Sequence, residues 1–226
     1  MRSMRDQNEK KKKDLSGHTR MYGFAKKLSS FVVRFLFPVK YIHVERLRDL
    51  KAPAILIANH QSWLDPMVIA HPCPHELRFL GKQELHKGRL LSYVMDHLHM
   101  IPVARHETDI AAMRACSRVL KDGYVLCIFP EGTRHQKQMM EEVEAGASLL
   151  ALRSGVPLIP IYFDKKMRFL RPTTVLVGEP IDYADLRADG VNMNNSDLLD
   201  QRIHDRFYAM RALVRNQTGD NKEAQK

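Results

Sequence analysis

The chain contains the apolar run Ala54-Ile55-Leu56-Ile57-Ala58, followed at once by Asn59-His60-Gln61-Ser62-Trp63-Leu64-Asp65-Pro66. Consecutive apolar residues without polar alternation predict a strand that is buried on both faces. The Asp-Pro pair predicts a helix over 65–70, because proline suits the first helical position. A buried strand that passes through a short turn into a helix is typical of an α/β protein.

Further short apolar runs lie along the chain, and helical patterns separate them. We therefore expect an α/β fold with a mixed, largely buried sheet that helices cover on both faces. Pro157 and Pro160 lack amide hydrogens, so the segment 156–161 is expected to be an edge or irregular strand. The expected strands are 54–58, 77–80, 100–103, 124–129, 158–163 and 173–177. The expected helices are 65–70, 89–98, one that follows Thr108 as its N-cap and ends at Gly123, 141–154 before Gly155, and one after Ser196.

The charge of the chain is concentrated at its N-terminus. The 226 residues carry a net charge of +10. Residues 1–51 hold fourteen Lys/Arg and five Asp/Glu, a net +9, so the rest is nearly neutral at 22 against 21. With 44% hydrophobic residues the chain can bury a core, which excludes wholesale disorder. Three cysteines without a bridging pattern exclude a disulfide scaffold and indicate a reducing compartment.

These properties divide the chain into four predicted parts. Residues 1–20 are expected to form a disordered basic tail, 41–215 the main domain and 216–226 a polar tail. Residues 21–40 are predicted to form a basic amphipathic helical segment, an N-terminal arm whose aromatic stripe fits either a membrane interface or the domain's own core. The basic tail upstream favours the membrane. No apolar stretch is long enough to span a bilayer, so we expect no transmembrane span.

His60 and Asp65 are the first candidates for chemistry. A histidine at the carboxyl end of a buried strand stands where α/β proteins place ligand sites. A carboxylate that folds back across the turn would fix the imidazole tautomer and leave the other nitrogen as a base for a substrate hydroxyl. The competing interpretation is that Asp65 caps the helix and His60 is an ordinary loop residue.

Further candidates follow other predicted strands. Phe129-Pro130-Glu131-Gly132-Thr133-Arg134 combines a glycine turn with a hydroxyl and a guanidinium suited to phosphate. Lys82 and Arg105 would add cations at neighbouring strand ends. Taken singly, these residues also fit an ordinary turn and solvated surface charges.

Four motifs in this order resemble the glycerolipid acyltransferase family, whose members include the 1-acylglycerol-3-phosphate acyltransferases. They are Asn-His-x-x-x-x-Asp from Asn59, Gly-Lys-x-Glu-Leu from Gly81 with Ile-Pro-Val-x-Arg from Ile101, Phe-Pro-Glu-Gly-Thr-Arg from Phe129, and Val-Pro-Leu-Ile-Pro-Ile from Val156. The resemblance covers roughly residues 40–185. His135 and Met100 depart from the family pattern near the expected substrate surfaces, which leaves the acceptor more open than the reaction.

The resemblance implies a reaction and roles for individual residues. His60 would be the general base and Asp65 would orient it. Acyl transfer also needs an oxyanion site, for which backbone amides within 59–63 are the expected donors. Glu131, Gly132, Thr133 and Arg134 would bind the acceptor, with Arg134, Lys82 and Arg105 on its phosphate. The reaction would move an acyl chain from a thioester on coenzyme A or acyl carrier protein to 1-acyl-glycerol-3-phosphate, giving phosphatidic acid at the cytoplasmic face of the membrane.

Alternatives stay open at this point. The acceptor could be glycerol-3-phosphate, another lysophospholipid or a lipid without phosphate, and the fold could serve a silent membrane-surface binding protein. Ser62 is a conceivable nucleophile, ranked below direct transfer, and Cys127 fits a core position. Thiolate departure requires no metal, so we expect no metal or cofactor. The main body lacks a nucleic-acid-binding motif, so we expect no nucleic-acid partner and an anionic membrane surface as the partner of the arm.

Overall fold

The computed structural model describes residues 22–82, 100–103, 110–130 and 146–218. Within them a mixed seven-stranded sheet has the order β1-β7-β6-β2-β5-β3-β4. Strands β6, β2, β5, β3 and β4 are parallel, while β7 and its parallel neighbour β1 run against β6. The strands are β1 (Val39–Ile42), β2 (Ala54–Ala58), β3 (Leu77–Lys82), β4 (Met100–Val103), β5 (Val125–Ile128), β6 (Leu158–Phe163) and β7 (Thr173–Val177).

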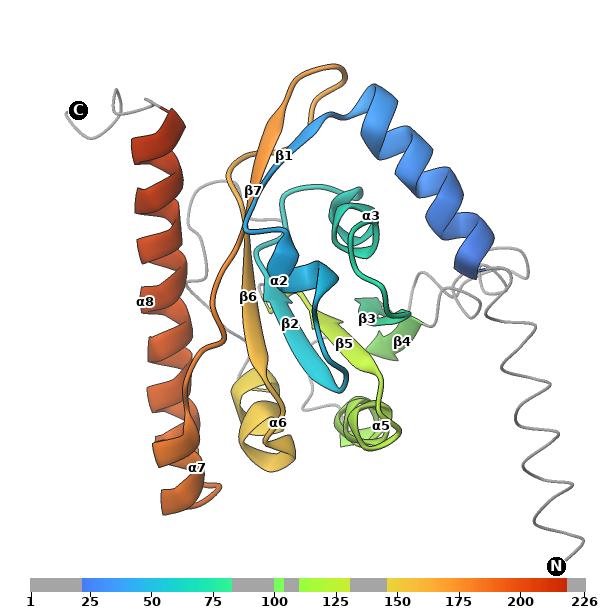
Figure 1. The fold of residues 1–226 in the computed structure, drawn as a ribbon. Coiled ribbons are helices and arrows are strands. Elements are labelled where there is room, and N and C mark those ends of the chain that lie inside the picture. The colour runs from blue at the N-terminus through green and yellow to red at the C-terminus, as the bar shows by residue number, and fades with distance from the viewer. Residues whose placement is uncertain (1–21, 83–99, 104–109, 131–145, 219–226) are drawn as a thin grey trace, which may run out of the picture.

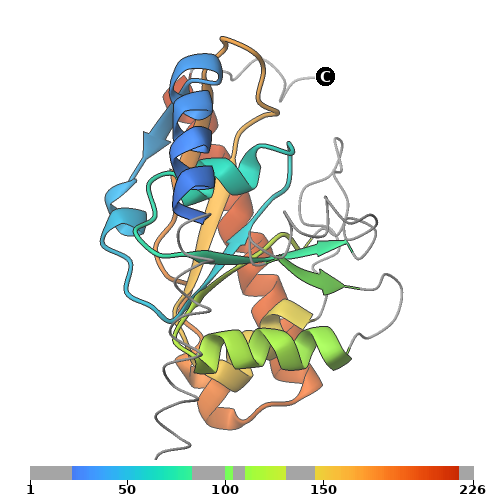
Figure 2. The ribbon, with the colours of Figure 1, turned by 90° about the vertical axis from the view of Figure 1, so that its right-hand side faces the viewer.

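Helices cover both faces of the sheet, as the sequence predicts (Figures 1 and 2). One face carries the N-terminal helix (residues 22–36), α2 (Glu45–Arg48) and α3 (Asp65–Ala70). The other carries α5 (Ile110–Lys121), α6 (Gly146–Ser154) and the long α8 (Met193–Thr218), with α7 (Ala184–Asp189) packed on α6 and α8.

Strand β2 explains why its sequence shows no polar alternation. Ile55 and Ile57 belong to the core under α5, α6 and α8, whereas Leu56 belongs to the core under α3 and the N-terminal helix. Successive side chains of a strand point to opposite faces. Since both faces are covered, every position of β2 is buried.

The predicted helix ends at Gly123 and Gly155 are confirmed by positive φ angles of 85° and 67°, which glycine adopts without steric cost. The prediction that the last helix follows Ser196 is wrong by four residues, because α8 begins at Met193. Asn192 Oδ1 accepts a hydrogen bond from the Asn195 amide at 2.8 Å and caps α8 earlier. This helix continues to Thr218, so residues 216–218 are helical rather than part of a tail. The predicted helix 89–98 lies outside the described residues, as do 108–109 and 141–145 and the basic tail 1–20.

The prediction of an edge or irregular strand around Pro160 is wrong, because β6 is a fully buried strand between β2 and β7. The register explains how proline is tolerated there. Pairing with β7 begins only at Ile161, so Pro160 stands just outside that ladder. Its carbonyl still accepts the Gly178 amide at 2.8 Å, so this position bonds to the chain after β7 without an amide hydrogen of its own.

The N-terminal helix has two apolar faces. Tyr22 and Val33 are buried, and the Tyr22 hydroxyl accepts a hydrogen bond from the Leu77 amide at 2.9 Å. The helix therefore packs on the domain's own core. A second stripe on the same helix stays more than half exposed, and it consists of Phe24, Leu28, Phe31 and Phe35.

Candidate active site

Asn59 fixes the carboxyl end of β2. Its Nδ2 donates to the Phe163 carbonyl at 2.9 Å, and its Oδ1 accepts the Phe163 amide at 2.7 Å. The side chain is fully buried and ties the end of β2 to the end of β6. The chain therefore leaves the sheet at a fixed point, immediately before His60.

His60 and Asp65 contact each other directly. His60 Nδ1 lies 2.9 Å from Asp65 Oδ2, and the Asp65 side chain is fully buried while 24% of the His60 side chain is exposed. The same Oδ2 accepts the Gln61 and Ser62 amides, both at 2.7 Å. Two backbone amides already donate to this oxygen, so it acts as an acceptor. His60 therefore contacts it through a protonated Nδ1, which puts the ring's lone pair on Nε2.

This geometry separates two interpretations that the sequence leaves open. The cap position of α3 is Leu64, which makes no side-chain cap hydrogen bond. Asp65 therefore does not act as the cap of α3, and its carboxylate turns back to the preceding turn and holds His60. Because the Gln61 and Ser62 amides are occupied by Asp65, these two do not form the oxyanion site expected within 59–63.

Neighbouring parallel strands end at the same edge of the sheet as His60. Phe129, directly after β5, lies against the His60 ring with centroids 4.4 Å apart, a contact that the sequence analysis missed. Adjacent parallel strands could have suggested it, since Ile57 of β2 pairs with Ile128 of β5. The backbone of Lys82 ends β3 beside Val103 at the end of β4. The predicted residues Arg105, Glu131, Gly132, Thr133 and Arg134 lie outside the described residues.

The structure also describes the two possible nucleophiles. Ser62 is buried, and its Oγ accepts the Leu64 amide at 3.4 Å. Cys127 is fully buried in β5, and burial raises the pKa of its thiol well above the ordinary value. A thiol held neutral in this way is a poor nucleophile, which fits a core role.

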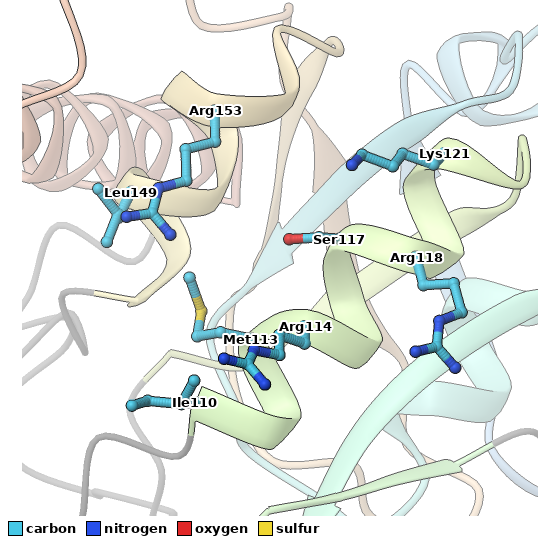
Figure 3. Close-up of a pocket in the computed structure, with 8 residues that line it drawn as sticks. All are labelled: Ile110, Met113, Arg114, Ser117, Arg118, Lys121, Leu149 and Arg153. Carbon is cyan, nitrogen blue, oxygen red and sulfur yellow. The ribbon is translucent and has the colours of Figure 1, made fainter.

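A separate groove of about 650 Å³ lies between α5 and α6 (Figure 3). Four of its lining residues are cations, namely Arg114, Arg118 and Lys121 of α5 and Arg153 of α6. Neither α5 nor α6 contains a carboxylate, and none of these cations has an ion pair within the described part of the chain. Neither His60 nor Asp65 lines the groove, so this cationic surface is separate from the His60–Asp65 pair.

Comparison with known proteins places this geometry in a family. The family model described as Acyltransferase matches residues 39–164, more than half of the chain. The 1-acyl-sn-glycerol-3-phosphate acyltransferase of Streptococcus pneumoniae is 25% identical over 87% of this chain and 75% of its own length. That of Bacillus subtilis is 23% identical over 73% of this chain and 84% of its own.

Other matches are shorter or structural. The chloroplastic 1-acyl-sn-glycerol-3-phosphate acyltransferase of Arabidopsis thaliana is 27% identical over 56% of this chain, which spans about a third (36%) of that relative. The crystal structure of the 1-acyl-sn-glycerophosphate acyltransferase PlsC from Thermotoga maritima aligns with a TM-score of 0.64 at 20% identity, over 88% of this chain and 79% of that one. It shares the fold. The family model matches more than half of the chain, and the matched residues include His60 and Asp65. The chain therefore belongs to the Acyltransferase family.

Proposed function

We propose that this protein transfers a fatty acyl chain from an acyl thioester to the free hydroxyl of 1-acyl-glycerol-3-phosphate and so forms phosphatidic acid. The observation that carries the proposal is the contact of His60 Nδ1 with the buried Asp65 carboxylate at the carboxyl end of β2. Relatives that share most of this chain carry the name of that activity.

The pair suits removal of a proton from a hydroxyl. An alcohol has a pKa far above 7, so its attack needs a base that accepts the proton as the bond forms, an effect of about 10²–10⁴-fold. In the proposed step His60 Nε2 accepts the proton, the acceptor oxygen bonds to the acyl carbon, and the carbon–sulfur bond breaks. The departing thiolate takes up the proton, and Asp65 stabilises the imidazolium that forms in between.

The acceptor phosphate requires cations near this edge. We assign that role to Arg134, with Lys82 and Arg105, and assign acceptor contacts to Glu131, Gly132 and Thr133. Support comes from the strand order, because β2, β3, β4 and β5 are parallel and end at the same edge as His60. Guanidinium groups bind phosphate through paired hydrogen bonds.

The donor is proposed to be an acyl-coenzyme A or an acyl carrier protein. Both present several negative charges, and the groove between α5 and α6 offers four cations without a carboxylate on either helix. We assign the non-reacting, anionic part of the donor to this groove. No metal or other cofactor has a role in the proposed step.

The acceptor is a membrane lipid, and we place the reaction at the cytoplasmic face of a bilayer. The N-terminal helix supports binding to a bilayer surface. Its exposed stripe of Phe24, Leu28, Phe31 and Phe35 lies beside Lys27 and Arg34 on the same helix. Apolar side chains flanked by basic ones are typical of helices that lie in a membrane interface. Among the described helices, none combines the length and hydropathy that a membrane crossing requires.

An acceptor screen tests the proposal. Purified protein is given one radiolabelled acyl-coenzyme A and, in turn, 1-acyl-glycerol-3-phosphate, glycerol-3-phosphate, a neutral monoacylglycerol and a choline lysophospholipid. We expect labelled phosphatidic acid from the first and little product from the others. Preference for another acceptor would reassign the substrate, and no transfer to any acceptor would favour a silent membrane-surface protein.

A further inference from the structure

The loop between β6 and β7, residues 164–172, exposes an apolar tip. Phe169 is 62% exposed and Leu170 59% exposed, although the neighbouring Met167 is buried and anchors the loop. Four exposed cations flank the tip, against one carboxylate, Asp164, so the loop carries a net +3. The cations are Lys165, Lys166, Arg168 and Arg171. Lys165 lies 3.9 Å from Asp164, and the other three have no ion pair within the described residues.

The backbone of the tip is held in an unusual conformation. The Arg171 amide donates to the Arg168 carbonyl at 3.1 Å and closes a tight turn. Leu170 inside this turn has a φ of 54°, in the left-handed region that glycine and asparagine normally occupy. A leucine at such a position costs conformational energy, and a residue that is 59% exposed gains little burial to offset that cost. Strained positions of this kind concentrate at functional surfaces.

The tip is continuous with the exposed stripe of the N-terminal helix. The Leu170 amide donates to the Leu36 carbonyl at 2.8 Å, and the Phe169 ring meets the Phe37 ring edge-on at 6.1 Å. Figures 1 and 2 show the loop beside the C-terminal end of that helix. The helix stripe ends at Phe35, so two segments distant in sequence form one basic and apolar surface.

The loop is also tied to the candidate active site. Strand β6 ends at Phe163, one residue before the loop, and both backbone groups of Phe163 bond to the Asn59 side chain. Asn59 directly precedes His60. A surface that holds the loop therefore also fixes the orientation of the sheet edge that carries His60.

We propose that the β6–β7 loop is a second membrane-docking element, which inserts Phe169 and Leu170 among lipid acyl chains while its cations contact lipid phosphates. A bilayer fits the whole surface, because apolar side chains meet the acyl region and cations meet an anionic headgroup layer. The inference rests on the proposed function only in that both place the protein at a membrane.

Vesicle binding by the full-length chain tests the loop. The apolar variant Phe169→Ser/Leu170→Gly should lower the partition coefficient about tenfold or more on phosphatidylcholine vesicles with or without phosphatidylglycerol. The charge variant Lys166→Glu/Arg171→Glu should lower the partition coefficient by more than about fivefold per residue on vesicles that contain phosphatidylglycerol. On phosphatidylcholine alone the partition coefficient should change little.

Two controls separate docking from folding. Leu170→Gly alone relieves the positive φ, so its melting temperature should not fall while its vesicle binding does. Met193→Ser removes a residue that is 63% exposed at the start of α8, which begins at the opposite end of the molecule from the loop (Figure 1), and should leave binding unchanged.

Wild-type vesicle binding by Phe169→Ser/Leu170→Gly, or an equal loss in Met193→Ser, would overturn the proposal. Acyl transfer to a short-chain, water-soluble acceptor, measured without vesicles, tests the proposed function separately from the docking role of the loop. The loop variants should keep this transfer at the wild-type rate. Its absence from the wild type would count against the acyltransferase assignment and not against the loop.

Discussion

Replacing Asp65 with asparagine keeps the shape of the side chain and removes its charge. Asp65 Oδ2 accepts His60 Nδ1 at 2.9 Å and the Gln61 and Ser62 amides at 2.7 Å. An NH2 group at this position would leave both amides unpaired, at about 1–3 kcal/mol each. The asparagine oxygen should therefore take the Oδ2 position, and His60 should keep its proton on Nδ1.

The expected loss of activity follows from the charge alone. A hydrogen bond to a charged group contributes about 1.5–3 kcal/mol, against about 0.5–1.5 kcal/mol for a neutral pair. The difference of about 1–1.5 kcal/mol predicts a kcat about 5- to 15-fold lower in Asp65→Asn. In a serine protease the corresponding change costs about 10⁴-fold because the tautomer is wrong, and the two amides of this site prevent that outcome.

The assay measures kcat from thiol release with saturating 1-acyl-glycerol-3-phosphate and acyl-coenzyme A. The ¹⁵N shifts of labelled histidine report the tautomer, and the spectrum of His60→Gln assigns the His60 signals. A loss above about 10³-fold together with a proton on Nε2 would refute the reasoning about the amides. An unchanged kcat would refute a role for the charge of Asp65.

Three further predictions concern other parts of the chain. Asn59→Ala leaves the two Phe163 backbone groups unpaired, so the free energy of unfolding should fall by about 2–4 kcal/mol in a urea titration. An unchanged unfolding midpoint would contradict a stabilising role for the Asn59 hydrogen bonds. Burial raises the pKa of Asp200, whose carboxylate accepts the Ser148 hydroxyl, so its charged form destabilises the fold above that raised pKa. Asp200→Asn should accordingly raise the melting temperature at pH 7, with the gain disappearing as the pH falls towards the ordinary aspartate pKa; a gain that persists at low pH would argue against this origin. Arg114→Glu/Arg118→Glu should raise KM for the acyl donor and leave KM for the acceptor unchanged, and the reverse split would move the donor away from the groove.

Much of the sheet could be predicted because burial on both faces leaves a direct mark on the sequence. The bounds of β2 and β7 agree with their apolar runs, since each strand is buried at every position. The helix ends at Gly123 and Gly155 were predictable because their left-handed backbone favours glycine. Such signals are local, so they can be recognised in the sequence before the tertiary fold is known.

Features that depend on partners distant in sequence were missed. Strand β1 has no fully buried position and forms only by pairing with β7. The position of β6 inside the sheet depends on where its pairing with β7 begins, which Pro160 alone does not reveal. The contact of Asn59 with Phe163 joins residues 104 positions apart. The spacing allows the Asp65 carboxylate either to turn towards His60 or to cap α3. Only the structure shows that it contacts His60.

The central claim is that His60 removes the acceptor proton, and the rate of phosphatidic acid formation by His60→Ala tests it most directly. The matched control is His71→Ala, which removes another partly buried histidine whose Nδ1 pairs with Ser30 Oγ at 2.7 Å outside the candidate site. We predict that kcat falls by about 10²–10⁴-fold in His60→Ala and stays near wild type in the control. Phosphatidic acid formed by His60→Ala at the wild-type rate would contradict the account.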